Sequence, residues 1–130
     1  MATSPYRDPA GDDLIALERE PHASGMIIRV VGDIDLCSYL QLRNELLTAL
    51  GAIEPHGTVV LDLTKVDFIA SVGLTELLMC QQLAITEEVT LRVVASDRRI
   101  LRPLEITGVD RMLDLYPNVD DALRAAEFAV

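Results

Sequence analysis

A single hydroxyl group stands where a predicted buried strand gives way to a predicted helix. Ser71 follows the apolar segment 58–63 after a short predicted turn, and Gly73 lies two residues further along the chain. The free N–H groups and the positive dipole end at a helix N-terminus favour an anion, so we expect a phosphate on Ser71 to be tolerated there. Alternatively, Ser71 only caps the helix, and Gly73 only allows the helix to approach the sheet closely.

Four aspartates would fit a different chemistry, a magnesium-assisted phosphoacceptor site. They are Asp33, Asp35, Asp62 and Asp67. Asp62 falls inside a predicted strand, whereas open α/β sheets carry their reactive side chains at the C-terminal ends of strands. No lysine follows a later strand to complete such a site. We therefore expect these carboxylates to be solvated or to favour helix starts, and we expect no metal.

Other catalytic and cofactor motifs are absent from the sequence. Its two histidines, His22 and His56, fall in predicted loops and lack the partner spacing of a metal site. There is no glycine-rich phosphate loop ending in Gly-Lys-Ser/Thr, and no Gly-x-Gly-x-x-Gly. The sequence therefore predicts a protein that is not an enzyme and has no cofactor.

Two cysteines offer a redox hypothesis. Cys37 is predicted at the start of one helix, where the N-terminus stabilises a thiolate, and Cys80 lies in the middle of the next helix. Adjacent helices on one face of a sheet would bring the two thiols near each other. The alternative is that both are small buried hydrophobic residues.

The elements that position these residues alternate between strand and helix. Strands are predicted at 14–19, 26–31, 58–63, 90–95 and 112–116, and helices at 38–53, 71–87, 96–107 and 118–128. Pro103 is expected to interrupt or restart the third helix. The order β-β-α-β-α-β-α-β-α predicts one α/β domain over residues 13–130, with a mixed, mostly parallel sheet and about four helices. Residues 1–12 are predicted to form a flexible tail.

Composition and charge exclude several classes of protein. Of the 130 residues, 50% are apolar and 25% charged, which is typical of a globular domain. The net charge of -10 argues against binding to nucleic acid or to an anionic membrane surface. No signal peptide or apolar run of membrane-spanning length occurs, and two cysteines cannot form a disulfide framework, so a cytoplasmic location is expected.

Four short segments carry a pattern that spans most of the chain. They read Gly32-Asp-Ile-Asp-Leu36, Val59-Val-Leu-Asp-Leu63, Asp67-Phe-Ile-Ala-Ser-Val-Gly-Leu74 and Leu104-Glu-Ile-Thr-Gly-Val-Asp-Arg111. In this order and spacing, and with the final segment 116–123, they resemble the STAS-domain family of anti-sigma factor antagonists, or anti-anti-sigma factors. The resemblance runs from residue 12 to residue 126.

The resemblance implies a regulatory binding protein. In this family the unphosphorylated antagonist binds an anti-sigma factor and so frees a sigma factor for transcription, and the partner is also an ATP-dependent serine kinase. Ser71 matches the phosphoacceptor position, beside an acidic loop that contains Asp33 and Asp35. A phosphate there is expected to weaken partner binding by repulsion and desolvation. The resemblance places these residues at the partner surface: Asp33, Asp35, Ala70, Val72, Gly73 and Thr75.

The sequence departs from the family pattern at two positions. Ala70 stands where the family has Asp, immediately before the acceptor, and Val72 stands where it has a second Ser or Thr. Two alternatives remain open beside the phosphorylation switch. One keeps the binding role without phosphorylation, through redox control by Cys37 and Cys80 or constitutive binding. The other is a small nucleotide-binding or phosphotransfer protein.

Overall fold

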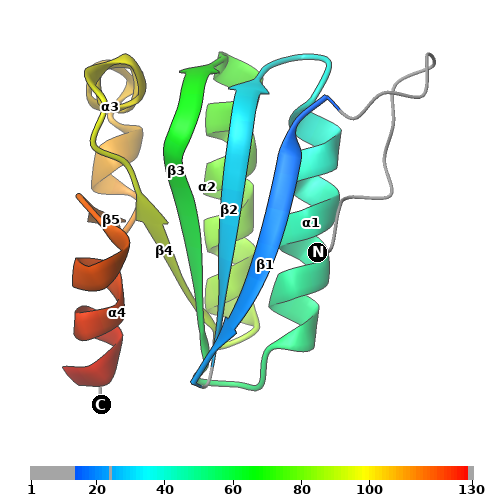
Figure 1. The fold of residues 1–130 in the computed structure, drawn as a ribbon, viewed down its shortest axis with the longest axis vertical. Helices are drawn as coiled ribbons and strands as arrows, with labels where there is room; N and C mark the ends of the chain where they lie inside the picture. Colours follow the sequence, from blue (N-terminus) through cyan, green and yellow to red (C-terminus); the bar gives the residue numbers. More distant parts are fainter. Residues whose placement is uncertain (1–13, 24, 129–130) are drawn as a thin grey trace.

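The sheet has five strands in the same order as in the chain, β1-β2-β3-β4-β5 (Figure 1). The structure, a computed structural model, describes residues 14–23 and 25–128, so the predicted tail lies outside the described residues. β1 (Ala16–His22) is antiparallel to β2 (Gly25–Ile34). β2, β3 (Thr58–Ile69), β4 (Thr90–Val94) and β5 (Leu115–Tyr116) run parallel. The predicted α/β fold class and element order are confirmed.

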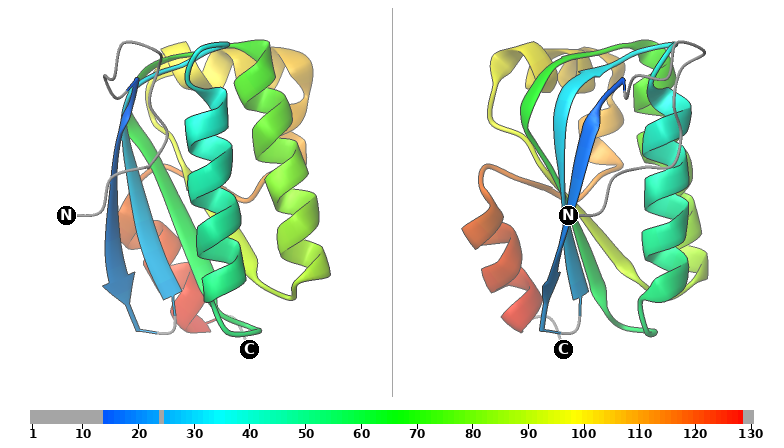
Figure 2. Two further views of the ribbon diagram at one scale, coloured as in Figure 1. Left: turned by 90° about the vertical axis from the view of Figure 1, so that its right-hand side faces the viewer. Right: turned by 45° about the vertical axis from the view of Figure 1, so that its right-hand side comes forward.

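Helices cover both faces of the sheet and one of its ends. α1 (Tyr39–Ala52) and α2 (Ser71–Thr86) lie side by side on one face, and α4 (Val119–Phe128) lies on the other (Figure 2). α3 (Arg98–Thr107) lies where β2 and β3 end, and is followed by the 3-10 turn η1 (Val109–Arg111). None of the helices in the described part of the chain combines the length and apolar character that crossing a membrane requires.

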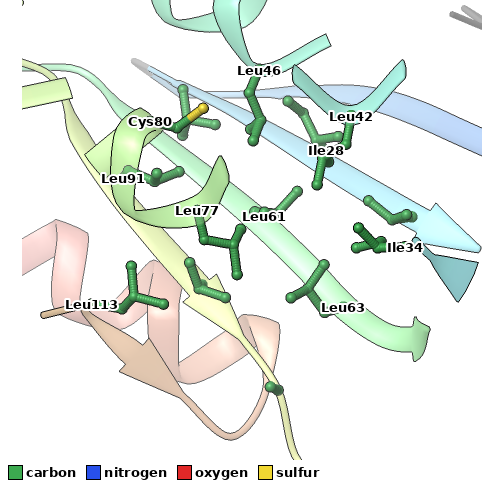
Figure 3. Packing of buried hydrophobic residues seen from close by; sticks show 14 of the residues in the cluster. Ile28, Ile34, Leu42, Leu46, Leu61, Leu63, Leu77, Cys80, Leu91 and Leu113 are labelled. Carbon is green, nitrogen blue, oxygen red and sulfur yellow. The ribbon is translucent and has the colours of Figure 1, made fainter. Parts of the chain in front are cut away.

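The main core fills the space between the sheet and α1, α2 and α3. Leu42 and Leu46 from α1 and Leu77 from α2 pack onto Ile28 and Leu61 of the central strands (Figure 3). A smaller cluster lies on the opposite face under α4. Because both faces are covered, the central parallel strands are almost continuously apolar instead of alternating.

The predicted ends of the first three strands are wrong because strand pairing continues beyond each of them, for β2 as far as Ile34. β3 was expected to stop at residue 63, but it runs on to Ile69, with Val66 and Ile69 buried and paired to β2. The connection left between the first two predicted strands, 20–25, is also too long, because the β1–β2 ladder continues to the pair His22 and Gly25. His22 therefore ends a strand instead of lying in a loop.

Packing also overrides two expectations about the helices. Pro103 lies inside an uninterrupted α3, whose buried residues Ile100 and Leu104 hold it against the core. Gly108 ends this helix in the left-handed conformation, as its sequence position predicts. The helical spacing of residues 71–87 also predicts Ile85 on the inner face, but Ile85 is 62% exposed, whereas the Glu76 carboxylate is buried beside Arg43 of α1.

Candidate functional site

Three strand ends meet at one edge of the sheet. β2, β3 and β4 run parallel, so the chain leaves all three at this edge and enters α1, α2 and α3 there. The amide of Ala70, just before α2, donates a hydrogen bond of 2.8 Å to the carbonyl oxygen of Ile34, the last residue of β2. This bond fixes the start of α2 beside the segment that carries the two aspartates. The C-terminal edge of parallel strands is where α/β sheets place their functional residues.

Ser71 is the first residue of α2, and its side chain is exposed. Ala70 occupies the capping position instead, with extended backbone and no side-chain hydrogen bond to the helix start. The alternative in which Ser71 caps the helix is therefore wrong. Thr75, one turn further along, is also exposed and donates a 3.2 Å hydrogen bond from its hydroxyl to the Ser71 carbonyl oxygen. The Ser71 side chain is therefore exposed at the helix start and is not used to cap it.

Gly73 brings the first turn of α2 into close contact with the sheet. A Cβ atom at this position would lie 2.6 Å from Cγ2 of Ile34 and 2.9 Å from Cγ1 of Ile69. Both neighbours are buried core side chains, so neither has space to move away. The expectation of a close helix–sheet approach at Gly73 is confirmed, and this approach sets the height of Ser71 above the sheet.

The two aspartates next to this turn have different surroundings. Asp33 is exposed and lies in β2, not in a loop, just after a register irregularity at Gly32, whose φ is +123°. The Asp35 carboxylate instead accepts hydrogen bonds from the amides of Cys37 and Ser38, at 2.9 and 3.1 Å. The carboxylate of Asp35 therefore organises the start of α1. Asp33 is the aspartate whose side chain remains open to a partner.

A groove of about 600 Å³ separates the start of α2 from α3. Its apolar part includes Phe68 and Ile106, which are 51% and 71% exposed. Its polar part includes Ser71 and Asp67 from one wall. Three arginines from α3 complete the lining: Arg98, Arg99 and Arg102.

The α3 side of the groove was not predicted from sequence. The charge pattern could have indicated a basic surface on this helix. Three of the 11 Lys and Arg residues fall within residues 98–102, in a chain with net charge -10. Phe68 and Ile106 gave no such signal, since large apolar residues in predicted elements are normally assigned to the core. Only the path of the chain through β4 places α3 next to Ser71.

Comparison with known proteins identifies the fold family. A family model described as STAS domain matches residues 15–122. The chain belongs to the STAS domain family. The anti-sigma-F factor antagonist RsfB of Mycobacterium tuberculosis is 31% identical over 111 residues, or 85% of this STAS domain protein and 88% of RsfB.

Solved structures agree with this assignment. An anti-sigma factor antagonist from Mycobacterium paratuberculosis is 32% identical, with a TM-score of 0.80 over 88% of this chain and 96% of that one. The anti-sigma factor antagonist SpoIIAA, in its unphosphorylated form, is 16% identical and shares the fold, with a TM-score of 0.71 over 88% of this chain and 99% of that one. The predicted resemblance to STAS-domain anti-sigma factor antagonists is confirmed.

The remaining residues expected at the partner surface gather around Ser71 in this STAS domain. Ala70 and Val72 are half-buried on either side of it, and Gly73 is buried against the sheet. Within residues 14–23 and 25–128, the His, Cys, Asp and Glu side chains form no group of three that could hold a metal ion.

The structure does not bring the two cysteines together. Cys37 is exposed in the turn before α1, whereas Cys80 belongs to α2 and its side chain is buried in the core (Figure 3). The Arg43–Glu76 ion pair aligns the two parallel helices. Cys37 comes six residues before Arg43 and Cys80 four residues after Glu76. At a helical rise of about 1.5 Å per residue, the two cysteines are therefore offset by about 15 Å along the helix axes. A disulfide tolerates a Cα separation of only about 7 Å.

The two thiols should differ strongly in reactivity. Burial raises the pKa of the Cys80 thiol to about 11, so about one Cys80 side chain in a thousand is a thiolate at pH 8. At this pH we expect a thiol reagent to modify one cysteine rapidly and the second only after unfolding in denaturant. The Cys37→Ser variant should show no rapid phase. Rapid modification of both cysteines, or a disulfide formed under mild oxidant, would contradict this expectation.

Proposed function

We propose that this STAS domain is an anti-sigma factor antagonist of the cytoplasm. It binds an anti-sigma factor of the serine kinase type and so releases a sigma factor for transcription. Phosphorylation of Ser71 by that partner, at the expense of ATP, switches the binding off. The protein acts through protein–protein contact, and it needs neither nucleic acid nor a membrane.

The observation that carries this proposal is the position of Ser71 within an exposed apolar surface. Its hydroxyl projects from the first turn of α2 and lines the same groove as Phe68 and Ile106. Large exposed side chains of this kind mark protein–protein contact sites when they cluster. The RsfB relative and the Mycobacterium paratuberculosis structure, both described as antagonists, support the same role.

The chemical step at Ser71 is a phosphoryl transfer. The Ser71 Oγ atom forms a bond to the γ-phosphorus of ATP, and the bond from that phosphorus to the ADP oxygen breaks. The hydroxyl proton leaves to a base on the kinase or to water. Since Ser71 lies on a fixed helix start rather than a loop, the bound kinase has to approach one well-defined position.

Two exposed isoleucines provide a matched test of the binding surface. Ile106 lines the groove and is 71% exposed, whereas Ile85 is 62% exposed at the far end of α2, about 21 Å along the helix from Ser71. We expect the wild-type protein and the Ile85→Ala variant to retain, from a lysate of the source organism, a protein with a histidine-kinase-like ATPase domain. The Ile106→Ala variant should lose at least about nine-tenths of it, because one apolar contact is worth about 1.5 kcal/mol or more.

Mass spectrometry of the retained proteins gives the readout. Equal retention by the two alanine variants would show that the partner binds elsewhere on the domain. If the wild-type protein retains no such ATPase, the proposed function is wrong, although the family assignment stands.

A further inference from the structure

One face of α3 presents positive charge to Ser71. Arg99, Arg102 and Ile106 are spaced three and four residues apart, so they share a face of the helix, and all line the groove that Ser71 lines from the other side. Arg98 lines the groove as well. This basic wall is unusual in a chain whose net charge is -10.

The three arginines differ in whether each guanidinium group is already paired with a carboxylate. Arg98 makes two hydrogen bonds to the Glu105 carboxylate, at 3.2 and 2.8 Å. Arg99 pairs with Asp97 at 2.6 Å and lies 3.4 Å from the Asp67 carboxylate, which is 67% exposed.

Arg102 makes no ion pair with any carboxylate in the described part of the chain. It is thus the member of the basic wall with an uncommitted charge. Arg99 holds the Asp67 carboxylate only through a longer, exposed contact, which a stronger anion can displace.

We propose that a phosphate on Ser71 is bound within the same chain by Arg102 and Arg99, in the groove between α2 and α3. This inference rests on the proposed phosphorylation of Ser71. A phosphoserine carries about -1.5 to -2 charges and three acceptor oxygens, more than the single carboxylate of Asp67. The planar guanidinium group forms paired hydrogen bonds to phosphate, which are stronger than those between neutral groups.

This arrangement changes the expected physical basis of the switch. Repulsion by neighbouring acidic residues was predicted from the sequence, but the Asp35 carboxylate is occupied at the start of α1. The charged groups around the groove are Asp33, Asp67, Asp97, Arg98, Arg99, Arg102 and Glu105. A phosphate held by the arginines lies at the Ser71 side of the groove and places a bound, hydrated anion beside its apolar wall. The partner then has to remove water from this anion to reach the apolar wall, and that desolvation weakens its binding.

The titration of the phosphate tests this proposal without any partner protein. Phosphoserine is installed at position 71 during translation, and its phosphorus NMR signal is followed from pH 4 to pH 8. An arginine bound to the phosphate favours the dianion, so the midpoint should lie below the free value of about 6. In the Arg102→Gln and Arg99→Gln variants the midpoint should rise by about 0.5 pH unit or more.

The Arg124→Gln variant is the matched control. It also removes one positive charge, but from α4 on the opposite face of the sheet, so its midpoint should equal that of the wild-type background. Equal midpoints in all four proteins would overturn the proposal. A midpoint above about 6 in the wild-type background would also overturn it, because the carboxylates Asp33 and Asp67 would then dominate. The result does not depend on whether an anti-sigma factor binds, so this proposal and the proposed function can fail separately.

Discussion

The Ser71→Glu variant is expected to bind the anti-sigma factor at least about tenfold more weakly than the wild-type protein, a loss of about 1.4 kcal/mol. The glutamate places a permanent negative charge at the groove that Phe68 and Ile106 line. An anti-sigma factor that covers this groove has to remove water from the new carboxylate. Its surface fits a neutral serine and offers no cation to pair with that charge, so binding weakens. Isothermal titration calorimetry with the captured anti-sigma factor gives the two dissociation constants.

The same substitution should leave the fold intact. Ser71 is exposed and its side chain makes no hydrogen bond that caps α2, and a carboxylate in the first turn of a helix is favourable. We expect the melting temperature of the variant to match or slightly exceed that of the wild-type protein. Thr86→Glu adds the same charge at the exposed far end of α2 and should bind normally. Equal affinities for Ser71→Glu and wild type would remove Ser71 from the proposed contact surface.

Substitution of one helical glycine should destabilise the domain, whereas the same change at another should stabilise it. In Gly73→Ala the new methyl group meets the buried side chains of Ile34 and Ile69 at 2.6 and 2.9 Å. Overpacking of this kind costs about 1–3 kcal/mol, which exceeds the roughly 1 kcal/mol that alanine gains over glycine in a helix. Net of that gain, we expect the free energy of unfolding to fall by up to about 2 kcal/mol in a urea titration.

Gly51→Ala is the control, because Gly51 lies near the end of α1, where an added methyl group would meet no neighbouring side chain or strand within 4 Å. It should raise the free energy of unfolding by up to about 1 kcal/mol. Since Gly73 sets the height of α2 above the sheet, Gly73→Ala should also displace Ser71 and weaken partner binding. A stabilised Gly73→Ala variant would contradict the close approach of the helix to the sheet.

The sequence predicted those features that depend on neighbouring residues. The change from apolar strands to helical spacing around Leu42, Leu46 and Leu77 identified an α/β domain with the correct order of elements. Ser71 was located correctly at the helix start because the apolar strand, Ser71 with Gly73, and the helical spacing follow one another along the chain. These signals are local, so the sequence alone can show them.

The sequence did not predict features that depend on pairing and on distant segments. Residues 64–69 were assigned to a turn because Thr64, Lys65 and Asp67 are polar, yet their backbone pairs with the last part of β2. Arg99 and Arg102 are separated from Ser71 by the whole of α2 and β4, and only the folded chain brings them to one groove. Side-chain exposure at Phe68 is likewise set by which elements cover it.

The order of strands in the sheet has a consequence for how the molecule is assembled. Each strand pairs with the one that precedes it in the chain, so no pairing waits for a segment made much later. Only the β1–β2 hairpin closes a short loop, because each parallel pair, such as Gly25 with Thr58, encloses a whole helix or helical segment between its strands. During synthesis, β1, β2 and β3 therefore have all their mutual partners before α3 is made. α3, which forms one side of the groove, is synthesised after these strands. The groove around Ser71 is therefore completed only once most of the domain has been made.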